Sequence, residues 1–208
     1  MSMKDAHIGG LPARIFRISF TGELSYEINV AARHGLALWT HLMKAGAAHG
    51  ITPYGTEAMH VLRAEKGFII VGQETDGSVT PHDLGMDWIV SKTKPDFIGK
   101  RALARESMGY HDRKQLVGLL CSDPKTVIPE GAHAVINPEQ PLPMDMLGQV
   151  TSSYFSPNCG RSIAMSMLKG GRGLMGQSVY FPMLDGTVLD ATVVNPIFFD
   201  PKGARIDG

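Results

Sequence analysis

The chain has 208 residues, and its 20 acidic side chains balance its 20 basic ones, so the formal net charge is zero. This balance argues against a nucleic-acid partner, because contacts from basic side chains to phosphates supply most of the affinity of such proteins. A membrane partner is not expected either, because no apolar run approaches the roughly 18 residues of a bilayer span. The first residues lack the apolar stretch of a signal peptide, and we expect a cytoplasmic protein.

The counts of cysteine, glycine and proline indicate the redox state of the thiols and the type of fold. Cys121 and Cys159 are the two cysteines and have no close spacing. One disulfide between them stays open, but reduced thiols fit a cytoplasmic protein better. The chain also has 24 glycines and 13 prolines, which indicate many turns and a β-rich fold.

Two strands joined by a turn are predicted near the N-terminus. Residues 1–13 show little pattern and are expected to form a loose entry segment. Residues 15–19 and 26–30 read as strands, and residues 21–25 between them have the length of a hairpin loop. The second strand contains Glu27, although strand interiors favour β-branched and aromatic side chains. We therefore interpret Glu27 as a residue that holds a polar ligand.

Two helices are predicted after this hairpin. Apolar residues at helical spacing indicate the first helix over residues 34–49. The second covers residues 57–66, with Thr56 as its N-cap and Gly67 as its end. Arg63 borders the apolar face of this second helix, so its stem is expected to pack while its guanidinium reaches outward.

Three further elements are predicted before residue 110. The apolar run at residues 68–71 reads as a buried strand, and residues 86–91 read as another strand. Residues 98–107 read as a short helix. A polar stretch without periodicity, residues 110–114, is interpreted as a linker between two modules.

After this linker the pattern changes to short strands separated by turn signals. The six candidate strands cover residues 116–121, 132–136, 148–154, 162–168, 178–183 and 187–194. Evenly spaced short strands predict a small barrel or sandwich. The predicted fold class is therefore α+β, with an α+β domain over residues 1–110 and an all-β domain over residues 115–208.

Several common site motifs are absent. No G-x-G-x-x-G follows a strand and opens a helix, and the glycine-rich residues 170–173 lack the spacing of a phosphate loop. We therefore expect no Rossmann-type flavin or nicotinamide site in this chain. The eight histidines show no ligand spacing, so no metal site is expected.

Several motifs, in the same order and at similar spacing, resemble the aminomethyltransferase (glycine-cleavage T-protein) superfamily. They are Phe20-Thr21-Gly22-Glu23 with Tyr26-Glu27, Leu62-Arg63-Ala64-Glu65-Lys66-Gly67, Val71-Gly72-Gln73-Glu74, Asp96-Phe97-Ile98-Gly99-Lys100, Leu116-Val117-Gly118-Leu119, and Phe155-Ser156-Pro157. Within the superfamily, the amino-acid sequence of residues 19–30 and 71–77 is similar to that of the C-terminal part of the α subunit of heterotetrameric sarcosine oxidase. The resemblance implies a partial folate-binding domain followed by a jelly-roll-like β-barrel.

The resemblance also implies a tetrahydrofolate site lined by Glu27 and Arg63, with Phe20 as a wall. A carboxylate suits the pterin ring, because the ring edge presents N–H donors that a carboxylate accepts in pairs. From spacing alone, an ordinary Glu–Arg salt bridge is an equal alternative. The family often has Tyr where this chain has Phe20 and Val71, so two hydroxyls are missing here.

For the whole enzyme, the resemblance implies oxidative demethylation of sarcosine, with the one-carbon unit passed to tetrahydrofolate as 5,10-methylenetetrahydrofolate. The family's essential aspartate lies upstream of the matched region, so no catalytic residue is assigned and the isolated chain is expected to be inactive. FAD, FMN and NAD are expected elsewhere in the enzyme, and the other sarcosine oxidase subunits are expected partners. Self-association of the fragment is also expected, through surface that the missing part would cover.

Two alternatives stay open. The same fold could serve an aminomethyltransferase or a related folate-dependent demethylase. A non-catalytic folate-binding or assembly module is the other alternative, and the absence of the upstream aspartate favours it for the isolated chain.

Overall fold

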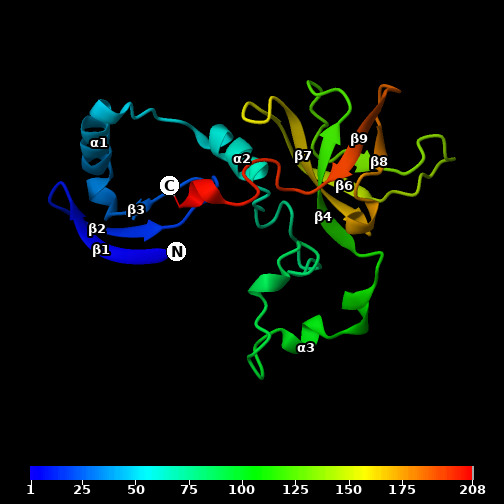
Figure 1. Cartoon of the computed structure of the whole chain (residues 1–208), viewed down its shortest axis with the longest axis horizontal. Helices are drawn as coiled ribbons and strands as arrows, with labels where there is room; N and C mark the ends of the chain where they lie inside the picture. The colour runs from blue at the N-terminus through cyan, green and yellow to red at the C-terminus, as the bar shows by residue number, and fades with distance from the viewer. Residues whose placement is uncertain (208) are drawn as a thin grey trace. The chain divides into compact units, whose positions relative to one another are not determined.

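The computed structural model describes residues 1–207. The chain divides into two compact units (Figure 1): one contains residues 1–63 and the C-terminal residues from Lys202, and the other contains residues 64–201. Cys121 and Cys159 are both free thiols. In the part of the chain that the structure describes, no helix has the length and apolar character needed to cross a membrane.

A three-stranded antiparallel sheet forms the first unit, in the order β1 (Ser2–Ile8), β2 (Leu11–Arg17) and β3 (Glu27–Asn29). The expectation of a loose entry segment was wrong, because β1 pairs with β2 along its whole length. Gly9 and Gly10 join the two strands, with φ of 57° and 83°. Two successive residues at positive φ make the tight turn that matches strand twist, which explains why this hairpin uses a Gly-Gly pair.

The predicted pairing of the next two strands is confirmed, although β2 begins and ends earlier than the predicted range 15–19, β3 is shorter than the predicted range 26–30, and the connection is longer. Ile15 of β2 lies opposite Ile28 of β3, and Phe16 lies opposite Glu27. The connection covers residues 18–26. The C-terminal segment, which contains a 3₁₀ turn at Ala204–Ile206, meets this connection: the Leu24 amide donates to the Arg205 carbonyl at 2.8 Å.

Both predicted helices are present. The first, α1 (Gly35–Gly46), is flanked by 3₁₀ turns at Ala32–His34 and Ala47–His49, so the predicted range 34–49 is helical almost throughout. The second, α2 (Thr56–Glu65), includes Thr56 in its first turn rather than as a cap. Gly67, with φ of 69°, follows the helix end, as expected.

Residues 66–113 contain less regular structure than predicted. The expected strand at 68–71 is absent, because the chain turns at once: the Ile70 carbonyl accepts the amides of Gln73 and Glu74. The expected strand at 86–91 is instead a 3₁₀ turn at Asp87–Ile89. The predicted helix at 98–107 is reduced to α3 (Lys100–Leu103) and a 3₁₀ turn at Glu106–Gly109.

All six predicted strands of the C-terminal half are confirmed. They are β4 (Lys114–Cys121), β5 (His133–Ala134), β6 (Gly148–Ser156), β7 (Arg161–Lys169), β8 (Ser178–Pro182) and β9 (Val188–Val194). They form an antiparallel sheet in the order β5-β6-β7-β4-β9-β8. Val135, which follows β5, exchanges two 2.9 Å backbone hydrogen bonds with Tyr180 of β8. This bridge joins the two ends of the sheet order into a barrel-like sheet.

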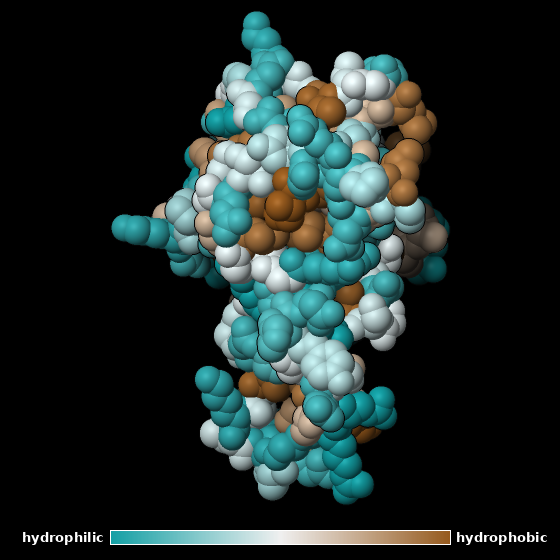
Figure 2. Space-filling model, turned by 90° about the vertical axis from the view of Figure 1, so that its right-hand side faces the viewer, coloured by the Kyte–Doolittle hydropathy of each residue, from teal (hydrophilic) through white to brown (hydrophobic). Residues whose placement is uncertain are grey.

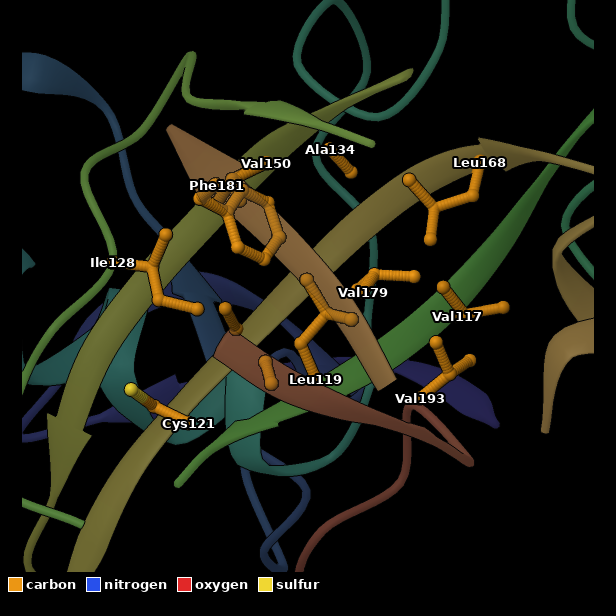
Figure 3. Close-up of a cluster of buried hydrophobic side chains, with 12 residues drawn as sticks. Val117, Leu119, Cys121, Ile128, Ala134, Val150, Leu168, Val179, Phe181 and Val193 are labelled. Carbon is orange, nitrogen blue, oxygen red and sulfur yellow. The ribbon is translucent and has the colours of Figure 1, made fainter. Parts of the chain in front are cut away.

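The main apolar core lies inside this sheet. Side chains from different strands converge on one interior (Figure 3), where Val117, Leu119, Leu168, Val179 and Phe181 are fully buried. The side of the molecule shown in Figure 2 is largely hydrophilic, with apolar atoms gathered in a recess framed by polar ones. The second unit builds this apolar core from side chains of the strands that the sequence predicted.

Candidate ligand-binding site

Glu27 is placed at the start of β3, where its side chain is exposed. Its Oε1 accepts a hydrogen bond of 2.9 Å from the side-chain nitrogen Nδ2 of Asn29. Residues two apart on a strand project to the same face, so the two side chains can meet without distorting the backbone. An oriented, exposed carboxylate of this kind keeps lone pairs for further N–H donors.

Phe20 lies in the connection between β2 and β3, and the residue is 38% exposed. The connection is shaped by its own polar groups: the Gly22 amide donates to Ser19 Oγ at 2.9 Å, and Ser25 Oγ donates to the Glu23 carbonyl at 3.1 Å. Gly22 has φ of 81°, which a side chain at this turn would disfavour. The Thr-Gly-Glu motif is therefore a formed turn that presents an aromatic ring.

A second set of contacts holds the same turn from the C-terminal segment. Arg205 Nε donates to the Glu23 carboxylate at 2.7 and 2.9 Å. Arg17 of β2 donates to the Ile206 carbonyl at 3.2 Å. These contacts restrict the connection on which Phe20 lies, so its shape depends on residues that are far away in the sequence.

Arg63 is completely buried on α2, with no exposed surface. The expectation of an outward-reaching guanidinium is therefore wrong. Arginine keeps its charge under all ordinary conditions, and a buried cation is retained only where acceptors compensate for the lost water. Arg63 is the largest fully buried side chain of the described residues. Its burial is therefore a feature of the folded chain that the helical spacing did not predict.

Two charged residues shortly after Arg63, Glu65 and Lys66, were not identified as site residues from the sequence. Glu65 is 2% exposed and Lys66 is 8% exposed. The Glu65 carboxylate accepts hydrogen bonds from Ser156 and Asn158 in the turn between β6 and β7, and Lys66 pairs with Asp200. Adjacent charges just before a helix-ending glycine were the available signal, but such residues are usually exposed.

A polar cavity of about 330 Å³ lies within the second unit. Glu74 on its wall is 2% exposed, and its carboxylate accepts bonds from the Ile70 amide at 2.7 Å and from Ser152 Oγ at 2.5 Å. Asp83 and Arg113 also line it, joined by two hydrogen bonds of 2.9 and 2.5 Å.

The electrostatics of that pair favour the charged state. Burial by itself raises the pKa of Asp83, but hydrogen bonds from Arg113 and Thr80 outweigh burial and hold this pKa below its ordinary value. The same contact raises the pKa of Arg113. The cavity wall is therefore a fixed ion pair, and neither member is poised for proton transfer near neutral pH.

Of the three residues predicted to form the site, the structure thus describes two exposed positions and one buried one. Glu27 and Phe20 belong to β3 and its preceding connection, and Arg63 belongs to α2. No cluster of three or more His, Cys, Asp or Glu side chains able to hold a metal ion occurs within residues 1–207. The assignment of these three side chains to one ligand site stays a prediction.

Two protein-family models match the chain. The GCVT N-terminal domain matches residues 1–94, and the glycine cleavage T-protein C-terminal barrel domain matches residues 114–200. The unmatched stretch between them, residues 95–113, contains all but the last residue of the predicted linker at residues 110–114. The domain boundaries inferred from the sequence, 1–110 and 115–208, stay a prediction.

Proteins similar to this chain include two sarcosine oxidase α subunits. That of Corynebacterium sp. (strain P-1) is 49% identical over 213 residues, covering 100% of this chain and 22% of the relative. That of Rhizobium meliloti (strain 1021) is 41% identical over 199 residues, covering 95% of this chain and 20% of the relative. The chain therefore spans about a fifth of the length of these relatives.

A solved structure confirms the fold. The glycine cleavage system aminomethyltransferase T from Bartonella henselae superposes with a TM-score of 0.78 at 24% sequence identity. The match covers 91% of this chain and 50% of that one. The predicted fold class, an α+β region followed by a barrel-like sheet of the aminomethyltransferase type, is therefore correct.

Proposed function

This chain belongs to the aminomethyltransferase (glycine-cleavage T-protein) superfamily, and we propose that it is the tetrahydrofolate-binding portion of a sarcosine oxidase α subunit. The observation that carries the proposal is similarity to sarcosine oxidase α subunits over 95–100% of this chain, at 41–49% identity. Members of this family depend on folate, so the site expected in this region is a folate site. When bound, tetrahydrofolate would accept the one-carbon unit of oxidative sarcosine demethylation as 5,10-methylenetetrahydrofolate.

Glu27 has the properties that a pterin edge requires. Its carboxylate is exposed, and the Asn29 amide orients one of its oxygens. A carboxylate accepts two parallel N–H bonds from a planar donor pair, and the charge strengthens both bonds. Glu27 therefore binds and orients the ring, and Phe20, with its partly exposed face, provides an apolar wall for it.

Arg63 would supply the positive charge of the site. Its complete burial gives the guanidinium a low-dielectric surrounding, in which attraction for an anionic group is stronger than in water. Its fork of donors suits a carboxylate, and the proposed ligand ends in carboxylates. Arg63 would either contact such a group or hold the neighbouring acidic side of the site in place.

The redox chemistry is assigned to other parts of the enzyme. The chain spans about a fifth of the length of the sarcosine oxidase α subunits that it resembles, so most of such an enzyme lies outside the matched region. FAD, FMN and NAD, together with the other subunits, are therefore proposed for the complete enzyme. The expected result for this chain alone is no turnover of sarcosine, and turnover without added subunits would contradict this assignment.

Calorimetric titration with 5-formyltetrahydrofolate, a reduced folate that is stable in air, tests the proposal. The unmodified chain should bind, and Glu27→Ala should lose roughly 2–5 kcal/mol, the cost of removing one partner of a charged hydrogen-bonded set. That loss corresponds to a Kd about 30-fold to several thousand-fold higher. Glu139→Ala, which removes an exposed carboxylate from a loop of the other unit, is the matched control and should bind normally.

Three outcomes of this titration are decisive. An absence of binding by the unmodified chain would overturn the proposed folate site. Equal binding by the unmodified chain and Glu27→Ala would remove Glu27 from the site. Binding with the expected loss, together with one-carbon transfer from a substrate other than sarcosine in the complete protein, would favour the alternative of an aminomethyltransferase or a related demethylase.

A further inference from the structure

The C-terminal end of α2 is held by buried charges that the proposed folate site does not use. The helix ends at Glu65, two residues after Arg63. Glu65 and Lys66 both turn their charged groups into the protein rather than into solvent. Ionised side chains in such positions are costly unless each is fully satisfied, so their partners identify what the arrangement fixes.

The Glu65 carboxylate accepts hydrogen bonds from side chains at the turn between β6 and β7. Ser156 Oγ donates to Oε1 at 2.5 Å, and the side-chain nitrogen Nδ2 of Asn158 donates to Oε2 at 2.8 Å. Ser156 is itself fixed, because its Oγ accepts the Cys159 amide at 2.9 Å. Both donors to the carboxylate are neutral, so the contact compensates the buried charge through geometry and without a cation.

Lys66 makes the second attachment. Its Nζ lies 3.0 Å from the Asp200 carboxylate and also donates to the Asp200 carbonyl. Asp200 has φ of 46°, a left-handed conformation that is rare for residues other than glycine. This conformation places both oxygens of Asp200 on one ammonium group. Residues held in such sparsely populated conformations persist where the surrounding structure enforces them.

The backbone at the helix end is fixed as well. The Glu65 carbonyl accepts the amides of Phe198 and Phe199, each at 2.9 Å. A Cβ at Gly67 would lie 2.7 Å from the Pro196 carbonyl oxygen, so the chain passes too close there for any other residue. Side-chain and backbone contacts together leave the last turn of α2 little freedom to rotate or slide.

This attachment determines where the side chain of Arg63 can lie. Residues two apart on an α-helix point about 200° apart, so Glu65 is held on the side opposite to Arg63. Contacts at Glu65 and Lys66 therefore oppose rotation and sliding of the last turn of the helix. Displacements of about 1 Å at a recognition group can cost roughly 100-fold in function. Fixing the end of the helix is therefore important for the position of the Arg63 guanidinium.

We propose that Glu65, with its donors Ser156 and Asn158 and with the Lys66–Asp200 pair, is a positioning group that sets the orientation of Arg63 for its ligand. The ligand class rests on the proposed function, namely the anionic part of a reduced folate. The positioning of Arg63 rests on the contacts alone. Glu65 is not a catalytic residue, because it acts through Arg63.

The first measurement uses the chain without ligand. The Nε of Arg63 is shielded from solvent, so its N–H proton should exchange slowly and give a distinct NMR signal in protein labelled with ¹⁵N-arginine. Glu65→Gln keeps the side-chain shape but cannot accept both donors, and it should speed this exchange by about tenfold or more. Val179→Ala in the barrel core is the control for general destabilisation, and it should leave the Arg63 exchange within about twofold.

A rescue variant separates positioning from a merely structural role. In Glu65→Gln with Asn158→Asp, the donor and acceptor are exchanged, so the contact and the net charge are restored. This double variant should return the Arg63 exchange rate to within about threefold of the unmodified chain. Recovery of thermal stability without recovery of the Arg63 signal would overturn the positioning role.

The second measurement is the Kd for 5-formyltetrahydrofolate. Glu65→Gln should raise it about tenfold, and the double variant should restore it, while Val179→Ala should leave it unchanged. If the unmodified chain does not bind but Glu65→Gln still speeds the Arg63 exchange, the proposed function fails and the positioning of Arg63 stands. If the unmodified chain binds and Glu65→Gln alters neither readout, the positioning role is overturned and the folate site stands.

Discussion

The two units of this chain bury their residues to very different degrees. Every residue of β7 except its two ends is buried, whereas β1 has no buried residue at all. In residues 1–63 the buried apolar side chains are Ala13 and Leu38, whereas the barrel-like sheet encloses an extended apolar core. A stretch of about 60 residues with so small a core gains little from apolar burial. The barrel-like sheet therefore supplies most of the stability, and the first unit contains all three residues of the proposed folate site.

The largest expected effect is a loss of stability on replacing a buried phenylalanine of the second unit, compared with an exposed phenylalanine of the first. Phe181 is fully buried in the barrel core, and Phe20 is 38% exposed in the first unit. Phe181→Ala should lower the free energy of unfolding by about 3–5 kcal/mol, because it removes apolar contacts and leaves a cavity. Phe20→Ala should lower it by less than about 1 kcal/mol. Urea unfolding followed by circular dichroism measures both, and equal losses would contradict the contrast between the units.

A smaller effect is expected at the buried ion pair of the second unit. Removing one partner of such a pair leaves the other charge buried, so Asp83→Asn should cost about 3 kcal/mol through the loss of its contacts with Arg113. Thermal unfolding at pH 7 would show this as a lower midpoint. A midpoint equal to that of the unmodified chain would mean that the pair is solvated.

The same pair predicts how stability depends on pH. The pKa of Asp83 in the folded chain lies below its ordinary value of 3.8, so its stabilising contribution is fully present above that value. The contribution is lost as pH falls from there through the folded pKa, because protonation then costs the Arg113 contact. Unfolding midpoints measured from pH 6 to pH 2.5 should fall more steeply for the unmodified chain than for Asp83→Asn. Parallel curves would contradict the assignment.

The smallest effect concerns a similar pair on the first unit. Asp5 and Arg14 face each other across β1 and β2 at 2.8 Å, but both side chains are more than half exposed. Water and salt screen such pairs, so Asp5→Asn should leave the unfolding midpoint unchanged within error. A marked drop would show that the first sheet depends on this contact, and it would weaken the contrast with Asp83–Arg113.

The comparison also explains which parts of the fold the sequence predicted well. The six barrel strands were predicted because each is a short run of strand-forming residues, and Gly and Pro mark the turns between them. β1 was missed because it buries none of its side chains, so no pattern records it; its pairing depends on the Gly9–Gly10 turn. The strands predicted at 68–71 and 86–91 failed because apolar runs are short there and turn hydrogen bonds take the backbone instead.

The candidate site also contains features that the sequence predicted and features that it did not. Glu27 was identified because a charge inside a strand is unusual, and it does lie at the start of a strand, exposed. Arg63 was identified through the resemblance, but its burial was not predicted, since helical spacing only placed it beside an apolar face. Glu65 and Lys66 were missed because their partners, Ser156, Asn158 and Asp200, lie more than 90 residues away in the sequence.

The sequence by itself determined the superfamily, the six strands of the barrel-like sheet and the residues proposed to meet a folate. These features depend on local patterns and on motifs that can be read in order along the chain. Only the tertiary structure decided that Arg63 is buried and that the end of α2 is held by Glu65 and Lys66. The reason is physical: burial and long-range hydrogen bonds depend on which distant segments meet, and no local pattern records that meeting.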